Sequence, residues 1–331
     1  MQKHHTVQSK YLAQWMNESK RQLNIYLISK NEYIERGPNW KGFWKKNYNI
    51  LDSDKKKFYL PEKVTELIDK QGIEVIKNID INSRNQLDGR KRGALAFYIA
   101  LQYIRTPRFR EEEDKFMEET IKFFMRKDVS SPDKFKITKE EVLKHQPTNE
   151  KEKIALEKIS AMTEEEINQQ SFDFIHSDDF HIKLTNTGHS KQILKIDRLA
   201  IKLFELQWLF IIAPNKTSFV TSDNPCFTIS PTKMHQGILS PNVTVFFPLR
   251  PDICIIIKPK LISKKEHFLE LDKRGVREIN KLILENSYQC LIAKDRMHIE
   301  NLTKNFDYKN HKKSRDTKVY QKGDYVMFNV E

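Results

Sequence analysis

The chain has 331 residues, and its 38% hydrophobic content predicts a modest core beneath a heavily charged surface. Lys and Arg outnumber Asp and Glu by 58 to 45, and the net charge of +13 favours polyanionic partners, nucleic acid first. A lysine-rich surface with no binding role would give the same balance. The chain has no apolar run near the ~20 residues of a membrane span and no cysteine pair with zinc spacing, which excludes those two classes. We therefore expect a cytoplasmic protein with reduced cysteines and no membrane partner.

The chain opens with two adjacent histidines, His4 and His5, ahead of a short amphipathic segment. Apolar residues at helical spacing predict that this segment docks on the core as a short helix. A docked segment would hold both imidazoles in place, whereas an undocked terminus would leave them in solvent. A strand is predicted next, at residues 24–29. The residues of the amphipathic segment are Val7, Tyr11, Leu12 and Trp15.

Two helices follow the first strand. The pattern over 61–71 predicts a helix that ends at Gly72, and the run over 94–104 is apolar almost all round, which predicts a buried helix. Gln102 is the polar interruption of the buried helix, and Arg105 follows on the same face. Both side chains need partners, because an unsatisfied buried polar group costs ~1–3 kcal/mol. Arg105 would offer a planar fork to a carboxylate or phosphate, or pair internally, for example with Asp223.

The middle of the chain is charged and helical. An amphipathic helix is predicted at 111–126, and two capping boxes, Thr138 to Glu141 and Thr163 to Glu166, each predict a helix start. We expect residues 108–190 to form a helical segment or subdomain within a single domain that spans residues 1–331.

Strand-like runs gather between residues 207 and 260. Each is short, rich in β-branched or aromatic residues, and bounded by Pro or Asn. The last run shows no alternation, so it should lie in the middle of a sheet with both faces covered. Together with the N-terminal strand and a final strand pair at 290–293 and 325–330, these runs predict a mixed sheet packed by helices, an α+β fold. The runs lie at 208–213, 219–221, 243–247 and 253–257.

A polar turn, Ser222-Asp223-Asn224-Pro225, ends the second of these runs. Ser, Asp and Asn bond readily to nearby backbone, so the turn is tight, and functional side chains are often placed on such turns. Asp223 could equally cap the turn with no further role. One more polar residue, Asn280, falls on the core side of a helix predicted from the apolar spacing of residues 276, 279 and 283.

These residues resemble the uncharacterised bacterial family catalogued as domain of unknown function 4238. Its members open with His-His-Tyr-x-Pro, then Tyr-Leu and an aromatic residue, and they carry Gln-x-x-Arg-x-Pro on a buried helix and Thr-Ser-Asp-Asn-Pro before a Phe-Pro-Leu strand. The chain departs from this pattern at Thr6, where the family has Tyr, and at Gln8, where it has Pro. If either residue matters for chemistry, this copy is altered or inactive. The resemblance implies a shared site but no established reaction. The matching residues are His4-His5, Tyr11-Leu12 with Trp15, Gln102, Arg105 with Pro107, Thr221 to Pro225, and Phe247 to Leu249.

Two classes of function fit these residues, since Gly-rich phosphate loops, zinc helices and nucleophile elbows are all missing. In the first, the protein is a nuclease-like enzyme. His4 or His5 would be the general base or acid, Arg105 would neutralise phosphate charge, and Asp223 would orient a histidine or hold a divalent cation. In the second, it is a binding module for nucleic acid or an acidic protein, in a bacterial defence or phage-conflict setting, and the same residues form a structural network. In either case we expect the polar residues to converge, with substrate contacts from Gln102, Ser222, Asn224 and Asn280.

Overall fold

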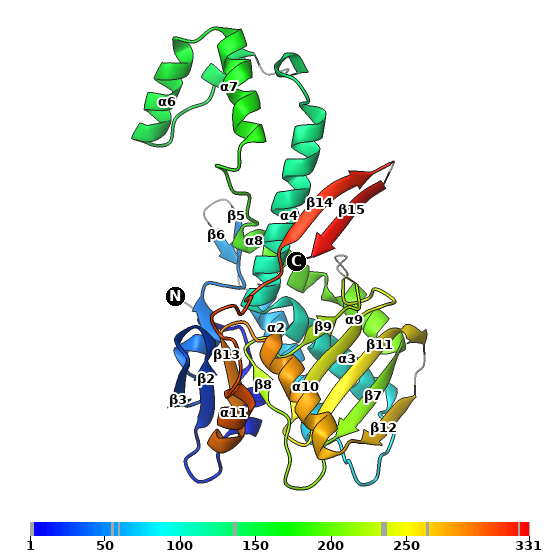
Figure 1. The fold of residues 1–331 in the computed structure, drawn as a ribbon. Helices are drawn as coiled ribbons and strands as arrows, with labels where there is room; N and C mark the ends of the chain where they lie inside the picture. The colour runs from blue at the N-terminus through cyan, green and yellow to red at the C-terminus, as the bar shows by residue number, and fades with distance from the viewer. Residues whose placement is uncertain are drawn as a thin grey trace. The chain divides into compact units, whose positions relative to one another are not determined.

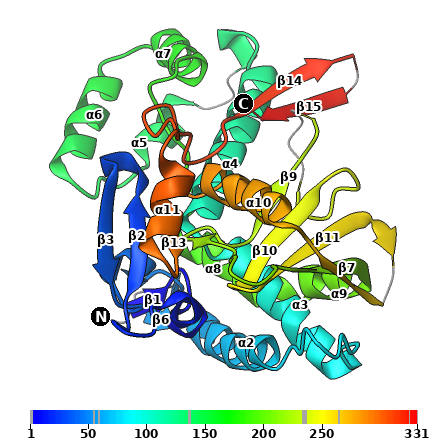
Figure 2. The same ribbon diagram turned by 60° about the horizontal axis from the view of Figure 1, so that its bottom comes forward.

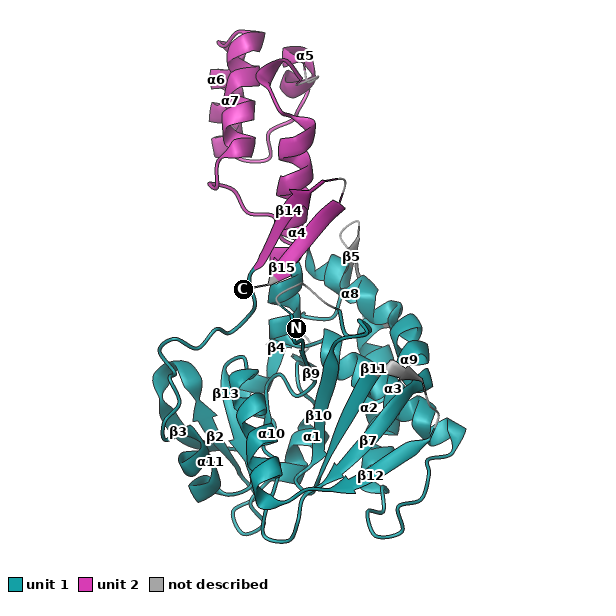
Figure 3. Ribbon diagram, turned by 45° about the vertical axis from the view of Figure 1, so that its right-hand side comes forward, with its two compact units in different colours: residues 1–113, 184–316, 330–331 teal, residues 114–183, 317–329 magenta. Residues whose placement is uncertain are grey.

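Residues 3–53, 56–58, 60–134, 138–232, 237–262, 265–323 and 325–330 are described by a computed structural model of the protein (Figure 1). The chain divides into two units, coloured separately in Figure 3. The first contains residues 1–113, 184–316 and 330–331, and the second contains residues 114–183 and 317–329. Sheets and helices in the first unit give an α+β fold, as predicted.

The larger sheet of the first unit is five-stranded, in the order β12-β7-β11-β10-β9. β12 runs parallel to β7 and the other neighbours are antiparallel, so the sheet is mixed. The strands are β7 (Leu206–Ile212), β9 (Phe227–Ile229), β10 (Thr244–Arg250), β11 (Ile253–Ile262) and β12 (Glu266–Glu270).

The apolar strand β11 lies at the centre of this sheet, as the missing alternation predicted. Ile255 and Ile257 point to one face and belong to a core shared with α2 (Leu60–Lys77), α3 (Gly89–Ile104) and α9 (Ile196–Glu205). Cys254, which precedes Ile255 and so points the opposite way, belongs to a second core on the other face. That core is shared with α10 (Lys273–Glu285) and α11 (Arg296–Thr303).

A second, four-stranded sheet has the order β3-β2-β13-β8, and all its neighbours are antiparallel. It collects strands from both ends of the first unit. The strands are β2 (Leu23–Leu27), β3 (Glu32–Arg36), β8 (Thr221–Ser222) and β13 (Cys290–Ala293).

The remaining elements of the first unit are short. A two-stranded sheet joins β1 (Lys3–His5) to β4 (Trp44–Lys46), and another joins β5 (Leu51–Ser53) to β6 (Lys56–Phe58). The helices are α1 (Ser9–Leu12) and α8 (Asn186–Leu194), with 3-10 turns at Ala13–Trp15, Ile28–Lys30 and Lys41–Phe43.

The second unit is mainly helical. Helix α4 (Pro107–Asp128) begins in the first unit and continues into the second. Both predicted capping boxes are formed, at Thr138 and Thr163, and each starts a helix. The other elements are the 3-10 turn Pro132–Lys134, α5 (Lys139–Leu143), α6 (Glu150–Ser160), α7 (Glu164–His176), and the strand pair β14 (Thr317–Lys322) and β15 (Tyr325–Val330). No helix in the described part of either unit is both long and apolar enough to span a membrane.

Three details differ from the sequence predictions. The run 219–221 contributes only its last residue to a strand, and that strand, β8, lies in the four-stranded sheet. The pairing of 290–293 with 325–330 is wrong, because β13 pairs with β2 and β8 while β15 pairs with β14. Gly72 does not end its helix. α2 continues to Lys77, and a Cβ on Gly72 would come within 2.3 Å of the Tyr98 ring, so the glycine serves the close approach of α2 and α3.

Candidate functional site

The N-terminal segment is docked on the core, as predicted. Val7, Tyr11, Leu12 and Trp15 all have 0% exposure. The Tyr11 hydroxyl donates to the Pro248 carbonyl oxygen (2.6 Å) and accepts from the Thr221 hydroxyl (2.7 Å). Trp15 Nε1 donates to the Phe219 carbonyl oxygen (2.9 Å). These bonds hold the segment immediately after the two histidines against β10 and against residues 219–221, which lead into the polar turn.

His4 lies in β1 opposite Lys45 of β4, and its side chain is fully buried. Its Nδ1 accepts the Asn49 backbone N–H (2.6 Å) and lies 3.5 Å from Glu62 Oε2. Burial, helped by the charges of Arg110 and His5, lowers the pKa of His4 to about 4. The imidazole is therefore neutral near pH 7, with its proton on Nε2, and it ties β1 to the loop between β4 and β5.

Glu62 and Arg110 complete the surroundings of His4. Asn49 donates from Nδ2 to Glu62 Oε2 (3.1 Å) and accepts at Oδ1 from Arg110 Nη2 (2.8 Å). Arg110 also lies over the Tyr48 ring, 3.4 Å from its centroid. Burial raises the pKa of Glu62 while the hydrogen bond from Asn49 opposes the shift. His4 thus belongs to a tightly bonded network.

His5, the next residue, is partly exposed and lies opposite Trp44. Burial lowers its pKa, as does the charge of Arg105, while a hydrogen bond with the Asn39 side chain acts in the opposite direction. The structure therefore brings His5 within electrostatic range of Arg105, which lies 100 residues later in the chain. His5 is neutral at pH 7, the form in which an imidazole accepts a proton.

Arg105 and Gln102, at the end of α3, are buried with 1% and 0% exposure. Arg105 Nη1 donates to both carboxylate oxygens of Asp69, at 3.0 and 2.8 Å, so its internal partner is Asp69 of α2 and not Asp223. Its Nε and Nη2 have no hydrogen-bond partner among the described residues. The same holds, within that part of the chain, for both Oε1 and Nε2 of Gln102. Four buried polar atoms at the end of α3 are thus left without a partner among the described residues.

The Asp223 carboxylate accepts hydrogen bonds from the backbone of residues 288–290. Its Oδ1 accepts the N–H groups of Tyr288 (3.0 Å) and Cys290 (3.3 Å), and its Oδ2 accepts that of Gln289 (2.8 Å). Burial raises the pKa of Asp223 to about 6, while these backbone donors pull it down. Lys45 of β4 lies close enough for the Asp223 charge to act on its ammonium group. The alternative considered from the sequence had Asp223 cap its own turn, whereas these hydrogen bonds hold a loop far along the chain.

The neighbours of Asp223 join the turn to the end of α3. Ser222 Oγ accepts the Asn224 backbone N–H (3.1 Å). Asn224 Oδ1 accepts from the Thr106 hydroxyl (3.2 Å), and its Nδ2 donates to the Asn286 carbonyl oxygen (2.9 Å). Because Thr106 follows Arg105, these bonds position the turn next to the Arg105 segment.

Asn280 is used elsewhere. Its Oδ1 accepts the Val220 backbone N–H (3.0 Å), and its Nδ2 donates to the Ser218 carbonyl oxygen (2.9 Å) and contacts His298 Nε2 (3.3 Å). Within the described residues it makes no hydrogen bond to His5, Arg105 or Gln102. His5 lies within electrostatic range of Arg105, and the polar turn is bonded to Thr106, the residue after Arg105. Asn280 lies in a separate group.

The sequence predictions omitted the buried polar residues of α2. Glu62, Thr65 and Asp69 are all buried and lie at i, i+3 and i+7, on the face that continues through Gly72. Polar residues at helical spacing, on a face that is otherwise buried, are a signal in the sequence of a buried polar site.

No ligand set for a metal ion is evident in this arrangement. Among the described residues, no group of three or more His, Cys, Asp or Glu side chains is placed to hold a metal ion. The oxygens of Asp223, the predicted cation ligand, accept backbone N–H groups.

Comparison with known proteins gives one result. The family model described as "Protein of unknown function (DUF4238)" matches residues 3–297, which include every residue of the site. No curated protein and no solved structure matches the chain. Since the match covers most of the sequence, the chain belongs to the DUF4238 family of proteins of unknown function.

Proposed function

We propose that this protein is an enzyme that cleaves or transfers a phosphodiester, with His5 as the general base and with Arg105 and Gln102 binding the phosphate. The observation that carries the proposal is the set of buried polar atoms without partners: Arg105 Nε and Nη2 and both amide atoms of Gln102, among the described residues. An unsatisfied buried polar group costs about 1–3 kcal/mol, and more when it is charged. A ligand that satisfies these atoms would recover that cost on binding.

The chemistry of these atoms favours an oxyanion. A guanidinium presents donors in a fixed planar fork that matches phosphate or carboxylate oxygens, and the Gln102 amide adds a further donor. Because Asp69 engages only Nη1, the remaining N–H groups of Arg105 are directed elsewhere. The +13 charge of the chain favours the phosphates of nucleic acid over a small carboxylate as the source of the anion.

His5 supplies the acid–base function in this proposal. It is partly exposed, whereas His4 is buried with its Nδ1 bonded to backbone, so His5 is the histidine that a substrate can reach. Its lowered pKa keeps it in the basic form at neutral pH. Asn224 acts indirectly, by bonding the turn to Thr106 beside Arg105, and Asp223 does so by bonding the same turn to the loop at 288–290.

The test compares three variants of the full chain on labelled single- and double-stranded DNA and RNA, with and without Mg²⁺ or Mn²⁺. His5→Ala should lower kcat/KM by about 10²–10⁴, the usual contribution of general acid–base catalysis, with little change in Tm. Gln102→Leu should lower activity yet raise stability by about 1–3 kcal/mol, because it replaces an unsatisfied amide with an apolar side chain of similar size. His267→Ala, at an exposed histidine of β12, is the matched control and should behave as wild type.

The pH profile gives a further readout. A general base acts when deprotonated, so activity should rise with pH through an apparent pKa below 6.5, the ordinary histidine value, and then level off.

Cleavage by His5→Ala at the wild-type rate would refute the assignment of the base. A Gln102→Leu variant that unfolds would indicate a structural network. Salt-sensitive binding without cleavage would favour the binding module, and absence of binding at low salt would remove nucleic acid as the ligand.

A further inference from the structure

A cavity of about 580 Å³ lies where α10, α11 and the loop at residues 216–218 meet. The two helices lie next to each other in both views of the fold (Figures 1 and 2). Its volume is within the ~300–1,000 Å³ typical of small-molecule sites. None of its lining residues belongs to the cluster around His5 and Arg105, so this is a separate place on the first unit.

Positive charge dominates the lining. Four cationic side chains contribute to it, and among the described residues none of the four makes an ion pair. The lining carboxylate, Asp295, accepts the Met297 backbone N–H (2.8 Å) as the N-cap of α11. An anion bound here would therefore meet four cations and a single lining carboxylate. The four cations are Lys216, Lys273, Arg277 and Lys304.

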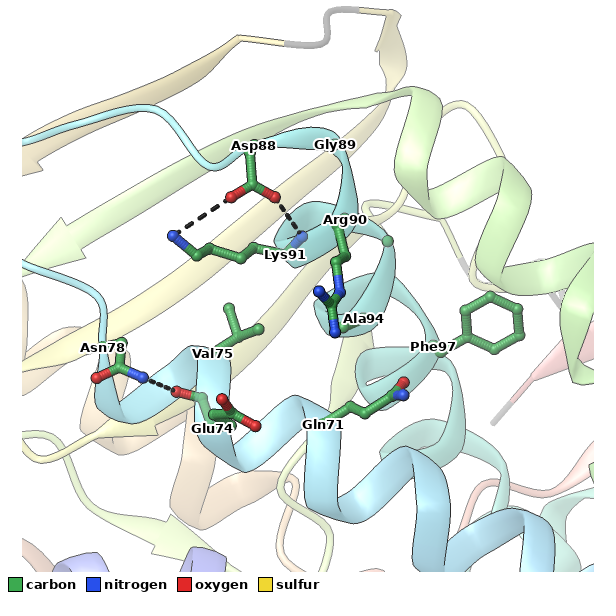
Figure 4. A pocket seen from close by; sticks show the side chains of 11 residues that line it. Gln71, Glu74, Val75, Asn78, Asp88, Gly89, Arg90, Lys91, Ala94 and Phe97 are labelled. Carbon is green, nitrogen blue, oxygen red and sulfur yellow. Dashed lines mark hydrogen bonds and ion pairs between the residues drawn. The ribbon is translucent and has the colours of Figure 1, made fainter.

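A cavity between α2 and α3 shows the contrast (Figure 4). Its volume is about 460 Å³, but its two cations, Arg90 and Lys91, are balanced by Glu74 and Asp88. Lys91 pairs with Asp88 at 3.3 Å. The excess of positive charge is thus a property of the cavity at α10 and α11 and not of both cavities.

The back wall of the charged cavity is fixed by hydrogen bonds. Because the Val220 N–H can only donate, the atom of Asn280 that faces it is Oδ1, and Nδ2 is the amide nitrogen that contacts His298 Nε2 (3.3 Å). His298 Nε2 is then the acceptor, and Nδ1–H faces Ser218 Oγ (3.3 Å). His298 is held as a neutral ring, so the charge of the cavity comes from the lysines and the arginine.

We propose that this cavity binds a nucleoside phosphate, with the phosphate on the cations and the base against the apolar part of the wall. That part is formed by Val276, Met297 and Leu302, and Met297 is 66% exposed, an apolar surface that a base would cover. The amides of Asn301 and Asn305 lie in the same lining and offer the donors and acceptors that read a base edge. The inference does not depend on the proposed activity at His5.

Titration calorimetry on the 331-residue chain tests this proposal with adenosine, inorganic phosphate, AMP, ADP and ATP. Two arms add a short oligonucleotide with a 5′-phosphate or a 5′-hydroxyl. ADP should bind more tightly than phosphate or adenosine alone. Arg277→Gln/Lys304→Gln should weaken ADP by about tenfold or more for the pair, because hydrogen bonds to charged groups are lost. Arg90→Gln/Lys91→Gln, which removes two exposed cations from the other cavity, should leave ADP affinity within about twofold.

The outcomes separate the sources of the ligand. Binding of free nucleotides supports a metabolite-sized ligand, and binding of only the 5′-phosphorylated oligonucleotide supports the same chemistry at a nucleic acid end. Adenosine binding as tightly as ADP, equal weakening by both double variants, or no binding of any phosphate probe would each overturn the proposal. Cleavage at His5 could fail while ADP still binds, so the two proposals are tested separately.

Discussion

At Asp223, burial and hydrogen bonding act on one carboxyl group in opposite directions. Loss of water raises its pKa to about 6, although three backbone N–H groups of the loop after α10 favour the charged form. In the unfolded chain an aspartate titrates near 3.9. The folded state therefore binds more protons than the unfolded state between about pH 4 and pH 6.

This proton uptake predicts the pH dependence of stability. A group whose pKa is raised on folding contributes stability that is present below about pH 4 and is lost as the pH rises through about 6. The difference in unfolding free energy between wild type and Asp223→Asn should therefore shift against wild type over that window and stay constant above pH 7. Urea unfolding at half-unit pH steps measures it, with the exposed Asp179→Asn as control. A difference that shifts in favour of wild type over the same window would contradict the raised pKa.

At the scale of elements, the contact between α2 and α3 depends on a missing side chain. Alanine normally stabilises a helix interior relative to glycine by about 0.5–1 kcal/mol. Gly72→Ala should instead destabilise the protein by about 1–3 kcal/mol, because its Cβ would lie 2.3 Å from Cγ of the Tyr98 ring, which is itself buried.

Gly93 is the matched control for this prediction. It lies inside α3, and a Cβ there would meet no atom within 4 Å. Gly93→Ala should therefore stabilise the protein by about 0.5–1 kcal/mol. Chemical denaturation of the two variants checks both signs, and stabilisation by Gly72→Ala would mean that α2 and α3 are farther apart than described.

The bounds of some strands could be predicted from the sequence, whereas their partners in the sheets could not. Strands such as β13 and β15 were predicted with their observed bounds, because runs of β-branched and aromatic residues between turn residues are a local signal. Their partners were not, because β13 pairs with residues 24–27 and 221–222, and such pairing has no local signature. Gly72 was misread for the same reason, since its role depends on Tyr98 of another helix.

The residues of the site likewise differ in whether their surroundings can be predicted from the local sequence. The burial of Gln102 and Arg105 follows from the apolar residues around them in one helix. Asp69 as the partner of Arg105 could be found only by knowing that α2 packs on α3. Asn280 was correctly predicted to face the core, yet the place it faces is the wall of another cavity.

The two units differ in how many apolar residues they bury. The first contains two extensive hydrophobic cores. In the second, α6 has no buried residue, and α7 buries Ile167 and Ile175. Helices with few buried apolar contacts open locally at low cost.

Hydrogen exchange should therefore separate the units. Backbone amides of α6 should exchange at least about a hundredfold faster than those of α3, whose opening requires disruption of the core. Mass spectrometry of peptic peptides from the full chain measures both in one sample. Equal protection of α6 and α3 would contradict the prediction. That residues 1–331 form a single domain stays a prediction for limited proteolysis, and release of residues 108–190 as an independently folded unit would contradict it.

The docking of Tyr11 determines when the N-terminal segment can fold during synthesis of the chain. Its two hydrogen-bond partners, Thr221 and Pro248, lie 210 and 237 positions later in the chain. At a translation rate of about 5–20 residues per second, the N-terminal segment waits about 10–50 s before β10 leaves the ribosome. During that interval Tyr11, Leu12 and Trp15 have no core to enter, and a chaperone that shields apolar segments would find them available. Any chemistry that depends on His5 can begin only when most of the chain has been made.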